Sequence, residues 1–130
     1  IVDSLWEYGI ELGRAFQLVD DILDLEGDER IGKPRGTDVH EGKMTLPIIY
    51  ALTMLHGEDR EHLKDVLTNF GDDRLHELVQ LLETAGSFEY SRVLVSNHVE
   101  RALEHLQALP DSDEKILLSE MALISEARTN

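Results

Sequence analysis

The sequence has 130 residues, no cysteine and a net charge of −15, with 27 Asp and Glu against 12 Lys and Arg. This length fits one domain or less, the lack of cysteine excludes disulfides and cysteine-bound zinc, and the acidity disfavours binding to nucleic acid. No window holds 18 consecutive apolar residues, so we expect no membrane span and a cytoplasmic protein.

The apolar residues recur at helical spacing along the chain, and no stretch alternates long enough to form a strand, so we predict an all-α fold. Ser4 and Glu7 form a capping-box pattern before the first helix, with Asp3 as a competing cap. About six helices are predicted, at residues 5–25, 46–55, 59–70, 72–85, 87–109 and 113–127. A glycine-containing loop is expected over residues 28–45.

The acidity itself has two readings. Disorder is one, but the regular apolar periodicity argues against it. Arg outnumbers Lys by 8 to 4 and the acids are scattered along the chain, which favours a halophilic origin. Dense carboxylates keep a surface hydrated in concentrated salt, where screening suppresses their mutual repulsion.

Three aspartates lie inside the first predicted helix, which has apolar residues on every side and is therefore expected inside a bundle. Asp20 and Asp24 are four residues apart, so their side chains project from neighbouring turns, and Asp21 flanks them. Gln17 extends the same polar strip. Carboxylates with no His or Cys nearby suit Mg²⁺ better than Zn²⁺, and Mg²⁺ fills its shell with water and substrate phosphates. The pattern therefore indicates diphosphate binding through a metal ion.

The loop after this helix contains two of the four lysines, Lys33 and Lys43, each directly after a glycine. Glycine lets the backbone approach a ligand closely, and a lysine ammonium is a compact charge suited to a phosphate oxygen. The aspartates and the lysines, each taken alone, also have a simpler interpretation. The aspartates could form a solvated face paired with Arg14 or Arg30, and the lysines could be ordinary loop residues.

Taken together, these motifs resemble the polyprenyl synthetases, which make geranyl, farnesyl, geranylgeranyl and longer diphosphates. The resemblance is carried in order by Phe16-Gln17, Asp20-Asp21-Ile22-Leu23-Asp24, Gly32-Lys33, Gly36-Thr37-Asp38, Gly42-Lys43 and Thr45-Leu46-Pro47. It is specific over about residues 9–55, and beyond residue 59 only helical character agrees. The family fold is the all-α isoprenoid synthase bundle around an apolar cavity, usually in a homodimer.

The resemblance implies roles for individual residues. By this resemblance, Asp20 is expected to bind Mg²⁺ directly. Asp21 and Asp24 are expected to be further ligands or partners through water, and Asp38 another outer-shell acid. Lys33 and Lys43 are similar to contacts of the allylic diphosphate. Gln17 is similar to a residue beside the prenyl chain.

The implied reaction condenses an allylic prenyl diphosphate with isopentenyl diphosphate. The family has two aspartate-rich motifs and this sequence has the second, so the resemblance implies that residues 1–130 are the C-terminal part of one synthase domain, the N-terminal half being absent. A halophilic archaeon is the favoured source. Such a chain is expected to be inactive alone, to self-associate through an incompletely covered Phe16, Val19 and Leu23, and to expose its aspartate strip. The alternatives are a non-catalytic partner subunit and a relative of the terpene cyclases.

Overall fold

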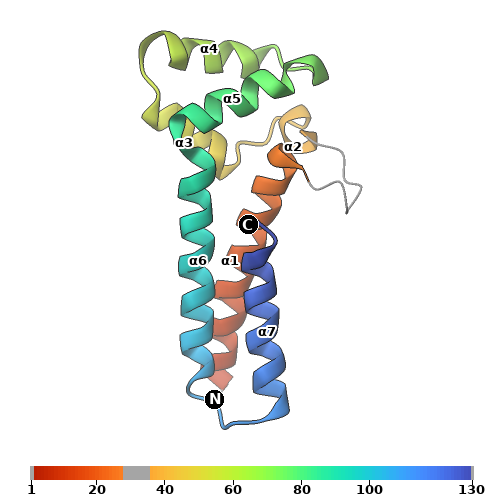
Figure 1. Cartoon of the computed structure of the whole chain (residues 1–130), viewed down its shortest axis with the longest axis vertical. Coiled ribbons are helices and arrows are strands. Elements are labelled where there is room, and N and C mark those ends of the chain that lie inside the picture. Colours follow the sequence, from red (N-terminus) through yellow and green to blue (C-terminus); the bar gives the residue numbers. More distant parts are fainter. Residues whose placement is uncertain (1, 28–35, 130) are drawn as a thin grey trace. The chain divides into compact units, whose positions relative to one another are not determined.

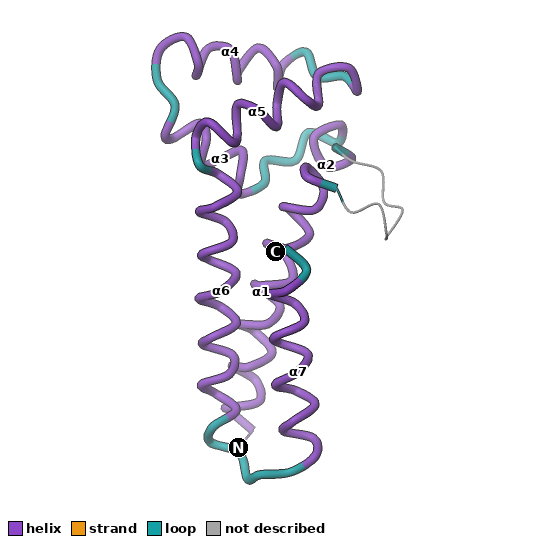
Figure 2. Tube along the Cα trace, viewed as in Figure 1, coloured by secondary structure: helices purple, strands orange, loops and turns teal. Residues whose placement is uncertain are grey.

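The computed structural model describes residues 2–27 and 36–129, and this part of the chain is helical with no strand (Figures 1 and 2). Its elements are α1 (Val2–Glu26), α2 (Thr37–His40), α3 (Leu46–Met54), α4 (Gly57–Thr68), the 3-10 helix η1 (Asp72–Arg74), α5 (Leu75–Ala85), α6 (Ser87–Leu106) and α7 (Asp113–Ala127). The all-α prediction is confirmed. The described residues contain seven α-helices rather than six, because α2 lies within the region predicted as a loop.

The described residues form two compact units. The first comprises residues 2–19 and 92–129, with parts of α1 and α6 and the whole of α7. Side-chain hydrogen bonds join all three helices. The Tyr8 hydroxyl of α1 donates to the Leu118 carbonyl of α7 at 2.8 Å. His98 Nδ1 of α6 lies 2.6 Å from Glu11 Oε2 of α1. The buried residues of this unit include Leu12, Ala15, Val95, Val99, Ala102, Leu106 and Ala122.

Glu11 and His98 form a largely buried ion pair within this unit. Burial alone would raise the pKa of Glu11. The hydrogen bond and charge of His98, with the charges of Arg14 and Arg101, outweigh that effect and hold the pKa below its usual value. The pair therefore supplies a polar contact between α1 and α6 beside the apolar core.

The second unit covers described residues between Asp20 and Ser91. In it α5 packs against α3 and α4, and Figure 1 shows α4 and α5 side by side. Its core includes the buried side chains Ile22, Leu25, Ile48, Ala51, Leu63, Val66, Leu78 and Leu82. Tyr50 of α3 stacks on Tyr90 at the start of α6, with ring centroids 4.2 Å apart.

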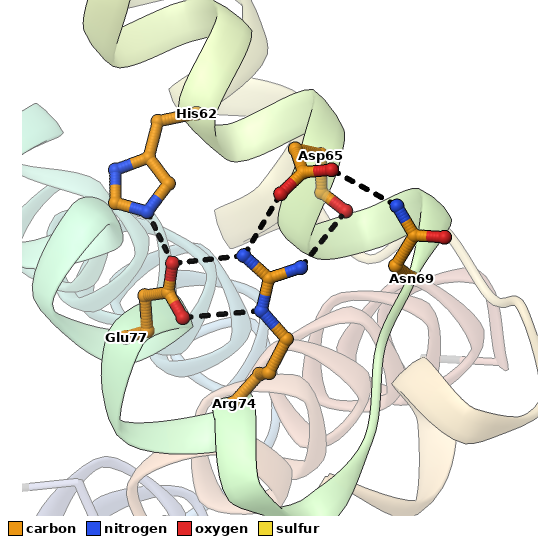
Figure 3. A network of polar contacts seen from close by, with 5 residues as sticks. All are labelled: His62, Asp65, Asn69, Arg74 and Glu77. Atoms are coloured by element: carbon orange, nitrogen blue, oxygen red, sulfur yellow. Dashed lines mark hydrogen bonds and ion pairs between the residues drawn. The ribbon is translucent and has the colours of Figure 1, made fainter.

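A polar network ties α4 to η1 and α5 on the surface of this unit (Figure 3). The Arg74 guanidinium donates to Asp65 at 3.0 Å and to both carboxylate oxygens of Glu77, at 2.9 and 3.1 Å. Asn69 also donates to Asp65, and His62 pairs with Glu77. These contacts lower the pKa of Glu77 to about 2, first through Arg74 and then through His62.

The expectation that α1 lies inside a bundle holds for one face of its first half, where Tyr8 and Leu12 are buried, and is wrong for the other face. Val2, Leu5 and Trp6 are exposed, while Val19 and Leu23 are buried within the chain's own fold. Phe16 is 38% exposed, so the expected incomplete cover holds for Phe16 alone among the three residues named for it. No helix within residues 2–27 and 36–129 is long and apolar enough to cross a membrane.

Candidate functional site

The three aspartates of the predicted metal site lie in the last two turns of α1, within the second unit. Their exposure differs sharply. Asp20 is exposed, whereas Asp21 is 6% exposed and Asp24 only 1%. The predicted open strip of three carboxylates is therefore wrong for Asp21 and Asp24. The tertiary fold sorts the motif into one solvent-facing acid and two buried ones.

Asp24 connects the end of α1 to α2. The backbone N–H of Asp38 donates to both carboxylate oxygens of Asp24, each at 3.3 Å. The Asp24 carbonyl accepts the N–H of Gly36 at 2.6 Å. Because the first N–H groups of a helix have no intrahelical partner, a carboxylate placed there supplies what the helix itself cannot. Asp24 thus caps the short α2 from a distant part of the sequence.

Lys43 follows α2 and is exposed. Its ammonium lies 3.0 Å from Glu41 Oε2 and 3.6 Å from Asp38 Oδ1, and its backbone N–H donates to the Asp38 carbonyl at 2.9 Å. The hydrogen bond that the Lys43 ammonium donates to Glu41, followed by the charges of Glu41 and Asp38, raises the pKa of Lys43. Lys43 is therefore a charged, solvent-facing ammonium whose present partners are carboxylates.

Lys33 and Gln17 were also predicted for this site. Lys33 lies outside the described residues, as does Arg30, the cation considered as an alternative partner of the aspartates. Gln17 is exposed on α1, three residues before Asp20. Arg14, the other alternative partner, instead donates to Glu11 at 3.3 Å.

The donor set around Asp20 is compatible with a hard divalent cation. The aspartates offer only carboxylate oxygens, and the solvent-facing one is free of the helix-capping task that occupies Asp24. Within the described ranges, no three acidic, His or Cys side chains converge to form a metal cage. Mg²⁺ commonly takes one or two carboxylates and completes its octahedron with water and phosphate oxygens. The residues therefore fit a cation shared with a phosphate ligand better than one enclosed by protein.

Two features of this region were not identified from the sequence. Glu41 is the nearer carboxylate partner of Lys43. Its place two residues before Lys43 in the sequence is only a weak indication of an ion pair. Thr45 occupies the N-cap position of α3, but its side chain makes no cap hydrogen bond. Its buried hydroxyl has no partner in the structure. A buried hydroxyl without a partner is uncommon, and no sequence pattern marks it.

Comparison with known proteins identifies the class to which this fold and site belong. The sequence model described as Polyprenyl synthetase matches residues 1–84. The chain is 40% identical over 123 residues to a short chain isoprenyl diphosphate synthase of Methanothermobacter thermautotrophicus, covering 93% of this chain and 38% of that protein. It is 37% identical over 122 residues to a geranylfarnesyl diphosphate synthase of Natronomonas pharaonis, covering 93% and 35%.

Solved structures agree with the sequence matches. Geranylgeranyl pyrophosphate synthetase from Pyrococcus horikoshii superposes with a TM-score of 0.86 at 28% identity, covering 96% of this chain and 38% of that one. Geranylgeranyl pyrophosphate synthase from Corynebacterium glutamicum, complexed with isoprenyl diphosphate and magnesium, gives 0.87 at 30% identity, covering 98% and 37%. This chain belongs to the polyprenyl synthetase family, whose members are isoprenyl diphosphate synthases. It spans well under half the length of these relatives.

Proposed function

We propose that this chain supplies the second aspartate-rich motif of a chain-elongating prenyltransferase, which condenses an allylic prenyl diphosphate with isopentenyl diphosphate. The observation that carries the proposal is the solvent-facing carboxylate of Asp20 in a segment that the polyprenyl synthetase family matches. The magnesium and isoprenyl diphosphate bound by the Corynebacterium relative support the choice of ligand.

In this reaction the allylic C–O bond breaks, and diphosphate leaves with the bonding electrons. The alkene of isopentenyl diphosphate attacks the resulting cation, and a proton is then lost to restore a double bond. Bound Mg²⁺ would stabilise the negative charge that develops on the leaving diphosphate. No nucleophile from the protein is needed.

The chain's own residues have separate tasks in this proposal. Asp20 would bind the cation directly, and the buried Asp21 would be a further ligand or a partner through water. The Lys43 ammonium exchanges its contacts with Glu41 and Asp38 for diphosphate oxygens, since an exposed lysine can reorient on its flexible stem. Lys33 is proposed as a second diphosphate contact, Gln17 as a residue beside the prenyl chain, and Asp38 as an outer-shell acid.

The chain alone is proposed to make no prenyl product. Its sequence contains one Asp-Asp-x-x-Asp motif, and its relatives are more than twice as long. Incubation with labelled isopentenyl diphosphate, an allylic diphosphate and Mg²⁺ should give no labelled product. Turnover at rates typical of enzymes, about 1 s⁻¹ or more, would show that a second motif is not required.

A non-catalytic partner subunit is the second candidate. It is favoured by the name of one relative, heptaprenyl diphosphate synthase component 2 of Geobacillus stearothermophilus, which is 32% identical over 128 residues. A relationship to the terpene cyclases is less well supported, because the lysine-bearing loop fits the elongating synthases. Whether the protein is an elongating synthase or a relative of the terpene cyclases, it is proposed to work in the cytoplasm.

Binding of magnesium diphosphate separates the metal-binding proposal from a purely structural subunit. Isothermal titration of the chain with inorganic diphosphate should show binding that requires Mg²⁺. Asp20→Asn should weaken it by about tenfold or more, because an interaction with a charged group contributes about 1.5–3 kcal/mol and about 1.4 kcal/mol corresponds to tenfold. Asp59→Asn, which changes another exposed aspartate, on α4, is the matched control and should bind normally. Equal affinity of the Asp20 variant and the control would refute the role of Asp20.

Self-association is the remaining proposal, and a homodimer is the simplest form. Apolar side chains are exposed along α7, among them Ile116, Leu117, Leu123 and Ile124. Large contiguous apolar patches are rare on soluble monomers. Light scattering at micromolar concentration in molar KCl should therefore give a mass above that of one chain. A stable monomer would contradict this proposal.

A further inference from the structure

The buried position of Asp24 separates it from Asp20, although both belong to one motif. Both Asp24 carboxylate oxygens accept the N–H of Asp38, and its carbonyl accepts the N–H of Gly36 at 2.6 Å. One residue therefore makes a side-chain and a backbone link to the start of α2. With 1% of its surface exposed, the Asp24 side chain is enclosed by the fold.

Residues 70–75 make further contacts with α2 and the glycine before it. Gly36 has a left-handed backbone with φ of 77°, and a Cβ there would lie 3.4 Å from Leu75 and 3.5 Å from Phe70. His40, at the end of α2, lies 2.6 Å from Asp72 Oδ1 and packs edge-on against the Phe70 ring. The four-residue helix is thus held by contacts with Asp24 and by contacts with Phe70 and Asp72.

Asp38 connects the Asp24 carboxylate to Lys43. Its N–H is held by Asp24, its carbonyl accepts the Lys43 N–H at 2.9 Å, and its carboxylate lies 3.6 Å from the Lys43 ammonium. The path from Asp24 to Lys43 therefore runs through a single residue.

We propose that Asp24 is a positioning residue, which fixes the backbone of Asp38 and thereby places Lys43 for the diphosphate, and that it does not bind the metal itself. The inference rests on the proposed function in one respect, the role of Lys43 as a diphosphate contact. It divides the motif into Asp20, which faces the ligand, and Asp24, which organises the segment that carries the lysine.

Amide hydrogen exchange of the 130-residue chain tests the structural half. Asp24→Ala removes the acceptor, so the Asp38 amide should exchange at least about tenfold faster, as expected for the loss of a hydrogen bond to a charged group. Asp24→Asn keeps one acceptor oxygen and should restore most of the protection. Far-UV circular dichroism confirms that each variant is folded. An unchanged Asp38 amide in folded Asp24→Ala would overturn the proposal.

Diphosphate binding in the presence of Mg²⁺ tests the functional half. Asp24→Ala should weaken the binding of inorganic diphosphate about as much as Lys43→Ala does. The double variant should bind no more weakly than Lys43→Ala alone, because Asp24 acts through Lys43. Asp24→Asn should recover most of the affinity, unlike Asp20→Asn. A loss in Asp24→Asn equal to that in Asp20→Asn, or additive losses in the double variant, would identify Asp24 as a direct ligand.

The proposed function and the positioning role of Asp24 can be refuted independently of each other. If the unmodified chain does not bind magnesium diphosphate, the proposed function of this chain is refuted. The link from Asp24 to Lys43 is then decided by amide exchange at Asp38 and Lys43. If binding occurs but Asp24→Ala changes neither exchange nor affinity, the positioning role is refuted while the proposed function stands.

Discussion

Tyr8 offers a direct test of how α7 is held against α1. Its ring is buried, and its hydroxyl donates to the Leu118 carbonyl at 2.8 Å across 110 residues of sequence. Tyr8→Phe removes this hydroxyl and keeps the ring. The substitution therefore isolates one hydrogen bond between the two ends of the chain.

The expected cost follows from the burial of both groups. A hydrogen bond contributes about 0.5–1.5 kcal/mol net, and a buried acceptor left without a donor costs about 1–3 kcal/mol. Leu118 is only half-buried, so water can replace part of the lost contact. We expect a loss of about 1–2 kcal/mol, which lowers the melting temperature by about 3–8 °C in a chain of this size.

The pH dependence gives a second signature of the same contact. Burial raises the pKa of Tyr8 above its ordinary value of 10.0. The fold therefore favours the neutral phenol, and this contribution is fully present below pH 10 and is lost as the pH rises through the raised pKa of the folded state. Tyr8→Phe should remove this part of the alkaline destabilisation.

Thermal melts by circular dichroism between pH 7 and pH 11 measure both effects. Tyr90→Phe is the matched control, because Tyr90 is 39% exposed and its stacking on Tyr50 needs only the ring. Its melting temperature should match that of the unmodified chain at neutral pH. Equal melting temperatures for Tyr8→Phe and Tyr90→Phe would refute the structural role of the Tyr8 hydroxyl.

Two further predictions concern charge. The pKa of Glu77 is lowered from 4.5 to about 2 by Arg74 and then His62, so its contribution to stability is present above pH 4.5 and lost as the pH falls to about 2. In urea unfolding at a series of pH values, Glu77→Gln should be less stable than Glu83→Gln above pH 4.5 and equal to it near pH 2. A constant difference at all pH values would contradict this. With a net charge of −15, the chain should also melt at a higher temperature in 1 M than in 0.1 M KCl, as the Debye length falls from about 10 to about 3 Å. Equal melting temperatures would contradict the halophilic interpretation.

The sequence was most informative where helix periodicity and local end signals agree. The α7 boundaries, Asp113–Ala127, match the prediction, and Ser112 caps this helix by accepting the N–H of Lys115. Gly86 ends α5 in a left-handed conformation, as a glycine after an apolar run predicts. These signals depend only on neighbouring residues, so they can be read without the tertiary structure.

The features that differ from the sequence-based predictions depend on contacts between residues far apart in the sequence. Residues 37–40 are too few to show a helical period, and the capping partner of this helix, Asp24, lies on α1. Spacing alone placed Asp20 and Asp24 on one strip, because helix geometry does not say which side chain the rest of the fold will cover. The same limit explains why Val2, Leu5 and Trp6, which are exposed in the first turns of α1, were expected to be covered.

The exposed position of Trp6 has a practical consequence for spectroscopy. It is the single tryptophan of the chain and is 69% exposed in the folded protein. Unfolding transfers its indole from one aqueous environment to another, so the wavelength of its fluorescence maximum should change little while the helices melt. The stacked ring pair of Tyr50 and Tyr90 is a better native chromophore, because its near-ultraviolet dichroism depends on a geometry that exists only in the folded second unit.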